Sequence, residues 1–203
     1  MCENCRARYF GTDRPTVSFG PYNWLVLEER DGKALLLCED IIERRVYNAT
    51  LTPVTWEDCA LRAYLNGEFL DGFSEEVRAR IALTHNENPD NTWGMFYGEP
   101  FNTPGGKPTD DHVFLLSVPE ILKYFPGLEL HTDSDDDKWY YEADKRLVVN
   151  FNTSGSWWWL RSPGSTQGRA AYVYRDGNVR LDGNGVSRGT GGVRPALWLN
   201  LKS

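Results

Sequence analysis

The sequence predicts an α+β fold of small antiparallel sheets, a few helices and long irregular loops. Strand-like apolar runs lie near both ends of the chain, at residues 24–39 and 157–201, and signals for helix starts are confined to residues 55–120 between them. A chain of 203 residues can bury one sizeable core. We therefore expect a single domain over residues 1–203, with residues 1–15 as a short tail.

The first expected element is a β-hairpin. Residues 24–28 and 34–39 are rich in strand-forming side chains, and Asp31-Gly32 between them is a strong signal for a tight turn. The next expected element is a helix that residues 55–58 begin as a capping box, with Leu61, Tyr64 and Leu65 on its apolar face.

A second helix is expected to begin at Ser74 and to turn Val77 and Ile81 inward. Residues 113–116 then predict a short buried strand, and residues 117–120 predict the start of a third helix. Long irregular loops, rich in Asn, Asp, Gly and Pro, are expected at residues 86–111 and 131–138.

The segment 157–201 alternates framework positions with short polar clusters. The framework is made of apolar and turn-forming residues: 157–164, Ala170-Ala171-Tyr172-Val173, Asp176-Gly177, Val179, Gly183, Val186 and 192–201. The positions left over are candidates for ligand binding: Ser165, Thr166, Gln167, Arg169, Tyr174, Arg175, Arg180, Leu181, Asp182, Asn184, Ser187, Arg188 and Thr190. Tyr174 is the best anchor among them, because a tyrosine offers a large amphipathic area with few rotatable bonds.

Charge is unevenly placed along the chain. Residues 161–194 hold six arginines and two aspartates and so carry +4, which leaves −11 for the rest of a chain whose net charge is −7. If Arg169, Arg175, Arg180 and Arg188 cluster, the protein should favour an acidic ligand surface. Alternatively, Arg161 and Arg194 are framework ion-pair partners and the other arginines are simply solvated. Nucleic acid is not expected as a partner at a pI of about 5.0.

The C-terminal pattern resembles the variable region of proteins diversified by diversity-generating retroelements. The residues that carry the resemblance are the tryptophan run through Gly164, the strand at 170–173, Asp176-Gly177, and residues 192–201. The resemblance implies a C-type lectin-like fold, in the variant that formylglycine-generating enzymes share. It also implies that adenine-directed mutagenesis alters the exposed codons while the framework codons stay fixed.

Most of the chain is also similar to an uncharacterised domain common in gut Firmicutes and their phages. The similar segments are residues 22–27, 33–37, 54–58, 61–66 and 113–118 together with the C-terminal framework. Many members of that domain family have no retroelement, so the framework alone does not establish diversification.

Metal and cofactor sites are not expected. Cys2 and Cys5 have ligand spacing, but Cys38 and Cys59 stand singly, so four zinc ligands are not assembled. Asp133 and Asp135-Asp136-Asp137, and more weakly Asn88-Pro89-Asp90, could supply oxygen ligands for calcium, although neither has a dedicated spacing. His85, His112 and His131 are expected to be loop or surface histidines.

The sequence is interpreted as a non-catalytic protein that binds a protein or another macromolecule through its C-terminal segment. The chain has no cysteine after Cys59, whereas formylglycine-generating enzymes rely on a cysteine pair near the C-terminus. Two alternatives stay open: a structural module of a phage or surface protein, and a relative of those enzymes that has lost its cysteines. No membrane span or signal peptide is expected, which predicts a cytoplasmic or phage-particle location.

Overall fold

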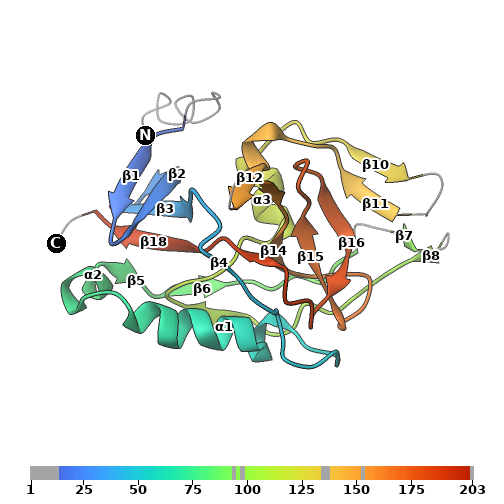
Figure 1. The fold of residues 1–203 in the computed structure, drawn as a ribbon, viewed down its shortest axis with the longest axis horizontal. Coiled ribbons are helices and arrows are strands. Elements are labelled where there is room, and N and C mark those ends of the chain that lie inside the picture. Colours follow the sequence, from blue (N-terminus) through green and yellow to red (C-terminus); the bar gives the residue numbers. More distant parts are fainter. Residues whose placement is uncertain (1–13, 93–94, 97–98, 134–137, 152–153, 202–203) are drawn as a thin grey trace.

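The computed structural model describes residues 14–92, 95–96, 99–133, 138–151 and 154–201. The fold is α+β with mainly β-structure, as predicted. Two sheets lie next to each other along the long axis of the molecule (Figure 1). The five-stranded sheet has the order β1 (Thr16–Phe19), β2 (Tyr22–Arg30), β3 (Lys33–Cys38), β18 (Ala196–Asn200), β5 (Ile81–Ala82).

The seven-stranded sheet contains most of the C-terminal segment. Its order is β10 (Leu130–Asp133), β11 (Lys138–Tyr141), β16 (Val179–Gly185), β15 (Arg169–Val173), β14 (Trp158–Pro163), β17 (Gly192–Val193), β4 (Glu43–Arg44). The chain passes from this sheet to the other one through Arg194 and Pro195. There Cys38 donates a backbone hydrogen bond to the Pro195 carbonyl (2.8 Å), and Arg194 Nε donates to the Cys38 carbonyl (2.8 Å).

The expected N-terminal hairpin is confirmed. β2 and β3 are antiparallel, and the two turn residues Asp31 and Gly32 have φ values of 51° and 72°. Positive φ at both central positions is the requirement of a type I′ turn, which Asp-Gly satisfies with little strain.

The helices begin in part where the sequence predicts. Ser117 and Glu120 form the expected capping box of α3 (Val118–Tyr124), and Ser74 caps α2 (Glu75–Ala79). A helical region follows Thr55 as predicted, and Leu61 and Leu65 on its apolar face are buried. The predicted capping box was wrong: Thr55 makes no side-chain cap, and the Cys59 thiol accepts the N-cap hydrogen bond of α1 from the Arg62 amide (3.3 Å). The helical elements of this region are η2 (Trp56–Asp58), α1 (Ala60–Tyr64) and the π-helical turn η3 (Leu65–Phe69).

Three further expectations are corrected. Ile81 lies in strand β5 and not in the second helix, because it pairs with Leu199 of β18. The buried segment 113–116 forms only a bridge, between Phe114 and Ala196. Residues 131–138 belong in part to the β10–β11 hairpin and are not simply an irregular loop.

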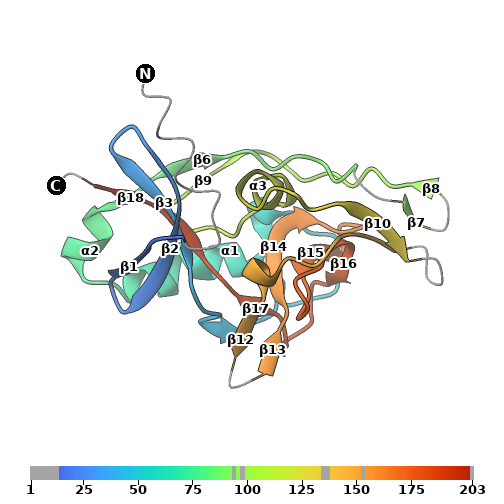
Figure 2. The same ribbon diagram turned by 90° about the horizontal axis from the view of Figure 1, so that it is seen from above.

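The described residues between 84 and 111 form a long antiparallel ribbon, where an irregular loop was expected at residues 86–111. Its strands are β6 (Thr84–Asn86), β9 (Thr109–Asp111), β7 (Met95–Phe96) and β8 (Glu99–Pro100). A bridge between Asn91 and Thr103 continues the same pairing. Seen from above, the ribbon extends from the five-stranded sheet toward the β10–β11 hairpin (Figure 2). A short 3₁₀ turn, η4 (Lys145–Leu147), and the pair β12 (Val149–Phe151) and β13 (Ser154–Ser156) complete the fold.

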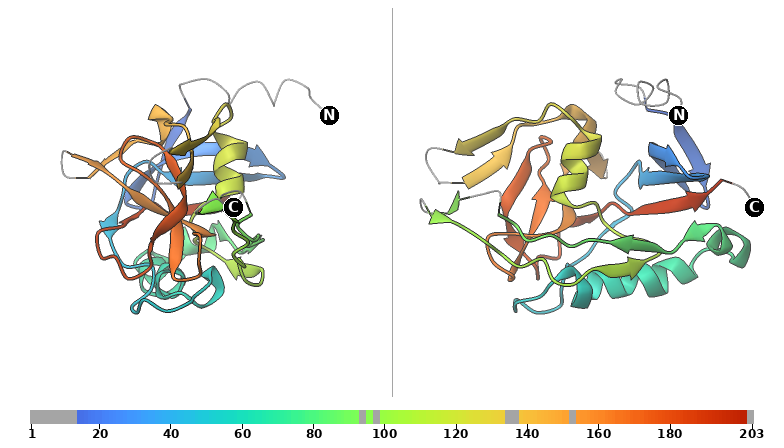
Figure 3. Two further views of the ribbon diagram at one scale, coloured as in Figure 1. Left: turned by 90° about the vertical axis from the view of Figure 1, so that its right-hand side faces the viewer. Right: turned by 180° about the vertical axis from the view of Figure 1, so that it is seen from behind.

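Large side chains fill the core between the sheets and helices. Trp24, Trp56, Trp158 and Trp159 are fully buried. Helix α3 lies on one side of the seven-stranded sheet, and α1 runs below both sheets (Figure 3). Helix α3 therefore does not cover the other side of the seven-stranded sheet at β15 and β16.

Candidate functional site

The β15–β16 hairpin carries most of the predicted binding residues. Its turn at Asp176-Gly177 is confirmed: Gly177 has φ 93°, and a Cβ there would lie 2.3 Å from the Asp144 carbonyl oxygen. The Asp176 carboxylate accepts a hydrogen bond from the Asn178 amide (2.9 Å). Glycine is thus required in this turn both by its backbone angle and by close packing.

Most framework positions of the C-terminal segment are buried, as expected, whereas Asp176 and Leu201 are exposed and Trp157, Tyr172 and Asn200 are partly exposed. Trp158, Trp159, Ala171, Val173, Val179, Val186 and Val193 are all 0% exposed. Gly191 also belongs to this framework, because a Cβ there would lie 2.0 Å from Trp159 Nε1.

Two of the thirteen candidates were wrongly predicted to be accessible. Leu181 is 0% exposed because it shares the inner face of β16 with Val179, two residues away. Asp182 is 4% exposed and is covered by Arg169, whose Nη1 lies 3.8 Å from its carboxylate. The other eleven candidates are partly or fully exposed.

The eleven exposed candidates lie at the two ends of the hairpin. Tyr174, Arg175 and Arg180 lie near the tight turn and are called the turn group here. The loop group comprises the candidates at the other end, where Arg169 pairs with Gly185: Ser165, Thr166, Gln167, Arg169, Asn184, Ser187, Arg188 and Thr190. Five strand residues separate the two ends, or roughly 16 Å. The sequence predicted one continuous surface, and the structure divides it in two.

Arg180 of the turn group belongs to a row of side chains that crosses five strands. Direct cross-strand pairs join His131 to Tyr140, Tyr140 to Arg180, Arg180 to Tyr172, and Tyr172 to Trp159. Directly opposed residues project from the same face of a sheet. The row therefore runs from the buried tryptophan outward to the half-exposed tyrosines and arginine.

Arginine and tyrosine side chains stack within the turn group. The Arg180 guanidinium lies 4.5 Å from the centroid of the Tyr140 ring and 5.8 Å from that of Tyr174, and Arg175 lies 5.1 Å from Tyr174. In the described part of the chain, neither Arg175 nor Arg180 forms an ion pair with a carboxylate. Both guanidinium groups keep donors for an anionic or polar ligand.

Three further residues of this surface were not predicted as binding residues from the sequence: Tyr140, Tyr172 and Trp157. Tyr172 packs edge-on against Trp157 (5.3 Å between ring centroids) and Tyr174 (6.3 Å). Burial, with a smaller contribution from Asp182, raises the pKa of Tyr172 to about 12, so it stays a neutral hydroxyl donor. Strand alternation through residues 172–174 places Tyr172 and Tyr174 on one face and could have identified Tyr172.

The loop group is held by polar contacts. Arg169 Nη1 donates to the Gly183 carbonyl (3.0 Å), Arg188 Nε donates to Asn184 Oδ1 (3.3 Å), and Gln167 Nε2 donates to the Pro104 carbonyl (3.4 Å). The four candidate arginines therefore do not form one cluster: two lie at each end of the hairpin.

The two framework arginines have different surroundings. Arg161 is 4% exposed and forms an ion pair with Glu120, with Nη2 donating to Oε1 at 3.1 Å. Arg194 is 1% exposed, and its guanidinium lies 5.0 Å from the Trp158 ring centroid. Burial lowers the pKa of Arg194 to about 10. Arg161 is therefore an ion-pair partner within the framework, as one of the two alternatives for the arginines predicted.

A family model described as Domain of unknown function (DUF6273) matches residues 31–201. The chain belongs to this family. The DUF6273 match includes β3, β18 and the whole β15–β16 hairpin, so the candidate surface lies within the family domain. No curated protein and no solved structure matches the chain.

The cysteines of this DUF6273 chain that the structure describes are buried thiols. Burial raises the pKa of Cys38 to about 11 and that of Cys59 to about 12, which makes both poor nucleophiles. Cys2 and Cys5 lie outside the described residues, as do Asp135, Asp136 and Asp137, and only the backbone of Asp133 is described.

The Asn88-Pro89-Asp90 motif has a structural role in the ribbon. Asn88 Nδ2 donates to the Lys107 carbonyl (2.7 Å), and Asp90 accepts from the Gly105 amide (3.0 Å). One potential metal-ligating group was missed: Glu129, His131 and Glu142 place a ligand atom each within 4.8 Å of one another.

Two open pockets lie away from the candidate residues. One, of about 260 Å³, is lined by residues that include Tyr22, Cys38 and Asp40. The other, of about 320 Å³, is lined by residues 126–128 and 142–146. No helix in the described ranges is long and apolar enough to cross a membrane.

Proposed function

We propose that this DUF6273 protein is a non-catalytic binding protein that recognises a macromolecular ligand with the turn group and the loop group. The observation that carries the proposal is the contrast in burial along one hairpin. Val173 and Val179 are 0% exposed, whereas the neighbouring Tyr174 and Arg180 are partly exposed. Substitution at the exposed positions changes contacts without removing core packing.

A rigid frame favours binding at such a surface. The framework strands are paired on both sides, and the segments next to them are fixed by a buried hydrogen bond from Asn91 and a partly buried one from Trp159. Side chains presented by an ordered backbone lose less conformational entropy when a ligand binds. Tyrosine and arginine are residue types enriched at binding hot spots, and Arg175 and Arg180 form no ion pair within the described ranges.

The finer proposal is that the scaffold is C-type lectin-like and that the exposed positions are diversified by a retroelement. It is supported by the resemblance of residues 157–201 and by the exposure of eleven of the thirteen candidate positions. The two buried candidates, Leu181 and Asp182, are excluded from the proposed variable set.

Resequencing the gene and its neighbouring DNA in many isolates tests diversification. We expect amino-acid replacements at the eleven exposed codons, constant codons at Leu181 and at the buried framework, and a nearby template repeat that differs at adenines. Replacements spread evenly over exposed and buried codons, or constant codons throughout, would contradict this part of the proposal.

A displayed library tests binding directly. One library randomises the eleven exposed positions, and a matched control library randomises Thr16, Val17, Ser18, Glu29 and Arg30, which are exposed on the other sheet. Both are selected against the same purified acidic and neutral proteins. We expect specific binders from the first library at a clearly higher frequency. Equal frequencies of binders in the two libraries would refute a specialised binding surface. If the selected chains instead bound only one another through one constant interface, the protein would be better described as an assembly module.

A further inference from the structure

We infer that Glu129, His131 and Glu142 form a binding site for a divalent transition-metal ion, with Zn²⁺ as the best match. The inference does not depend on the proposed binding function. It rests on the geometry of the β10–β11 hairpin, which brings together three side chains that are 13 positions apart at most in the sequence.

The hairpin places the three side chains on one face. His131 and Tyr140 are directly opposed, and Glu129 and Glu142 each lie two residues further toward the open end of the hairpin. A backbone hydrogen bond from the Glu142 amide to the Glu129 carbonyl (2.8 Å) fixes the strands there. Because residues two apart in a strand share a face, both carboxylates project on the side of the imidazole.

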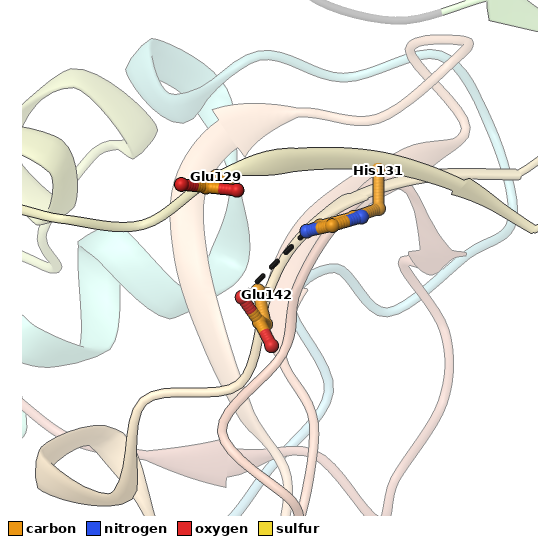
Figure 4. A group of neighbouring side chains, drawn as sticks. All are labelled: Glu129, His131 and Glu142. Atoms are coloured by element: carbon orange, nitrogen blue, oxygen red, sulfur yellow. Dashed lines mark ion pairs between the residues drawn. The ribbon is translucent and has the colours of Figure 1, made fainter.

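The imidazole points between the two carboxylates (Figure 4). His131 Nε2 lies 3.6 Å from Glu142 Oε2, and the ligand atoms of all three residues lie within 4.8 Å of one another. Nε2 is shielded from solvent and has no hydrogen-bond partner in the described ranges. The ring is oriented by stacking on Tyr140, at 6.0 Å between centroids and 27° between planes.

Among the described residues, no lysine or arginine balances the two carboxylates of this cluster. The nearby Arg146 is engaged by Asp144. Two carboxylates held this close repel each other. A divalent cation would remove this repulsion and would give Nε2 a direct bond in place of its 3.6 Å contact with Glu142.

The ligand set matches zinc better than calcium or magnesium. One imidazole nitrogen and two carboxylate oxygens are typical zinc ligands, and three protein ligands leave one position open. Zinc–ligand bonds of about 2.0–2.2 Å require ligand atoms roughly 3.3 Å apart. The Nε2–Oε2 distance is already close to that value, and the exposed glutamate side chains can close the remainder by changing rotamer.

His85 provides a matched control within the same chain. It is also flanked by two carboxylates, with Nδ1 2.9 Å from Asp110 and Nε2 3.6 Å from Glu87. The two carboxylates contact different ring nitrogens, so no single ion can be bound by all three residues as they are placed. A nonspecific attraction of zinc to exposed His and Glu side chains would act at both histidines.

The test is a calorimetric Zn²⁺ titration of the full chain with Cys2→Ser and Cys5→Ser, which removes the unplaced cysteine pair. We expect one saturable site per chain, weakened at least about tenfold by His131→Gln or Glu142→Gln and unchanged by His85→Gln. Co²⁺ should give a visible spectrum of nitrogen and oxygen ligation without a thiolate charge-transfer band. Unchanged melting temperatures of the variants show that folding is intact.

Three results would overturn the inference. They are the absence of saturable Zn²⁺ binding in the parent chain, equal loss of affinity in the His131 and His85 variants, and a thiolate band with Co²⁺. If His131→Gln did not fold, Glu142→Gln and Glu129→Gln, which change exposed side chains, would decide the question.

Discussion

At the scale of single residues, buried polar side chains hold the irregular segments in place. Asn91 is 0% exposed, and its amide donates to the carbonyl oxygens of Pro163 (2.8 Å) and Leu181 (3.0 Å). Asp111 is also 0% exposed, and its carboxylate accepts hydrogen bonds from Trp56 and Asn86, each at 3.0 Å, and from other donors. These contacts fix the ribbon of residues 84–111 against the seven-stranded sheet and the helices.

Replacing Asn91 by alanine should lower the free energy of unfolding by about 2–3 kcal/mol, because buried carbonyl oxygens lose their donors. Thr92→Ala is the control: this neighbouring residue of the ribbon is exposed, so a change below about 0.5 kcal/mol is expected. Urea denaturation measures both. Equal losses would show that the ribbon is not anchored through Asn91.

Tyr172 and Tyr174 should differ in stability although they are neighbours on one face. Tyr172→Ala removes packing against Trp157 and should cost about 2–3 kcal/mol, whereas Tyr174→Ala should cost less than about 1 kcal/mol. Thermal unfolding of the two variants checks this. A large loss for Tyr174→Ala would place this residue in the core and remove it from the recognition surface.

The free energy of unfolding should depend on pH through the ionisation of the Glu28 carboxylate. Its burial raises the pKa, but hydrogen bonds from Tyr124 and Lys123 outweigh that effect and lower the pKa below its usual value of 4.5. A lowered pKa in the folded state contributes stability above about pH 4.5, which is lost as the pH falls through the folded value. Glu28→Gln should therefore cost less than about 1 kcal/mol at pH 7 and have a vanishing effect near pH 2. Urea unfolding at several pH values measures this; a constant difference would contradict it.

At the scale of elements, turns and caps determine where strands and helices begin. A turn or helix start could be predicted from the sequence when one short motif meets the backbone requirement by itself. Examples are the turns at Asp31-Gly32 and Asp176-Gly177 and the capping box of α3. The start of α1 could not be predicted, because its N-cap is Cys59, and cysteine is not among the residues that N-cap preferences favour. The ribbon of residues 84–111 was missed because its strands are short and are held by contacts distant in sequence.

Gly32→Ala should destabilise the protein by about 1 kcal/mol through backbone strain alone, since φ is 72° and nothing lies within 4 Å of the added Cβ. Gly67→Ala is the matched control, because its Cβ site is equally empty and it lies in the helical turn η3. There alanine should stabilise the protein by about 0.5–1 kcal/mol. Opposite signs in chemical denaturation are expected; equal signs would contradict the assigned backbone conformations.

At the scale of the whole molecule, two sheets that the chain connects at Arg194-Pro195 and at residues 39–42, among other places, form the frame for the β15–β16 hairpin. The α+β class and the buried C-terminal framework could be predicted from the sequence. The division of the candidates into two groups could not, because it depends on the length of the hairpin. Two further features could not be predicted from the sequence: the place of Tyr140 in the surface and the cluster of Glu129, His131 and Glu142. Both depend on the pairing of strands β10, β11 and β16.

The central claim is that burial separates fixed from replaceable positions in residues 157–201. Saturation mutagenesis of this segment, read out as protease resistance of the displayed chain, tests the claim most directly. We predict tolerance of most substitutions at the eleven exposed candidates and intolerance at Leu181, Asp182 and the buried framework. Equal tolerance in the two sets, or intolerance at Thr166, Arg175 and Arg188, would contradict it.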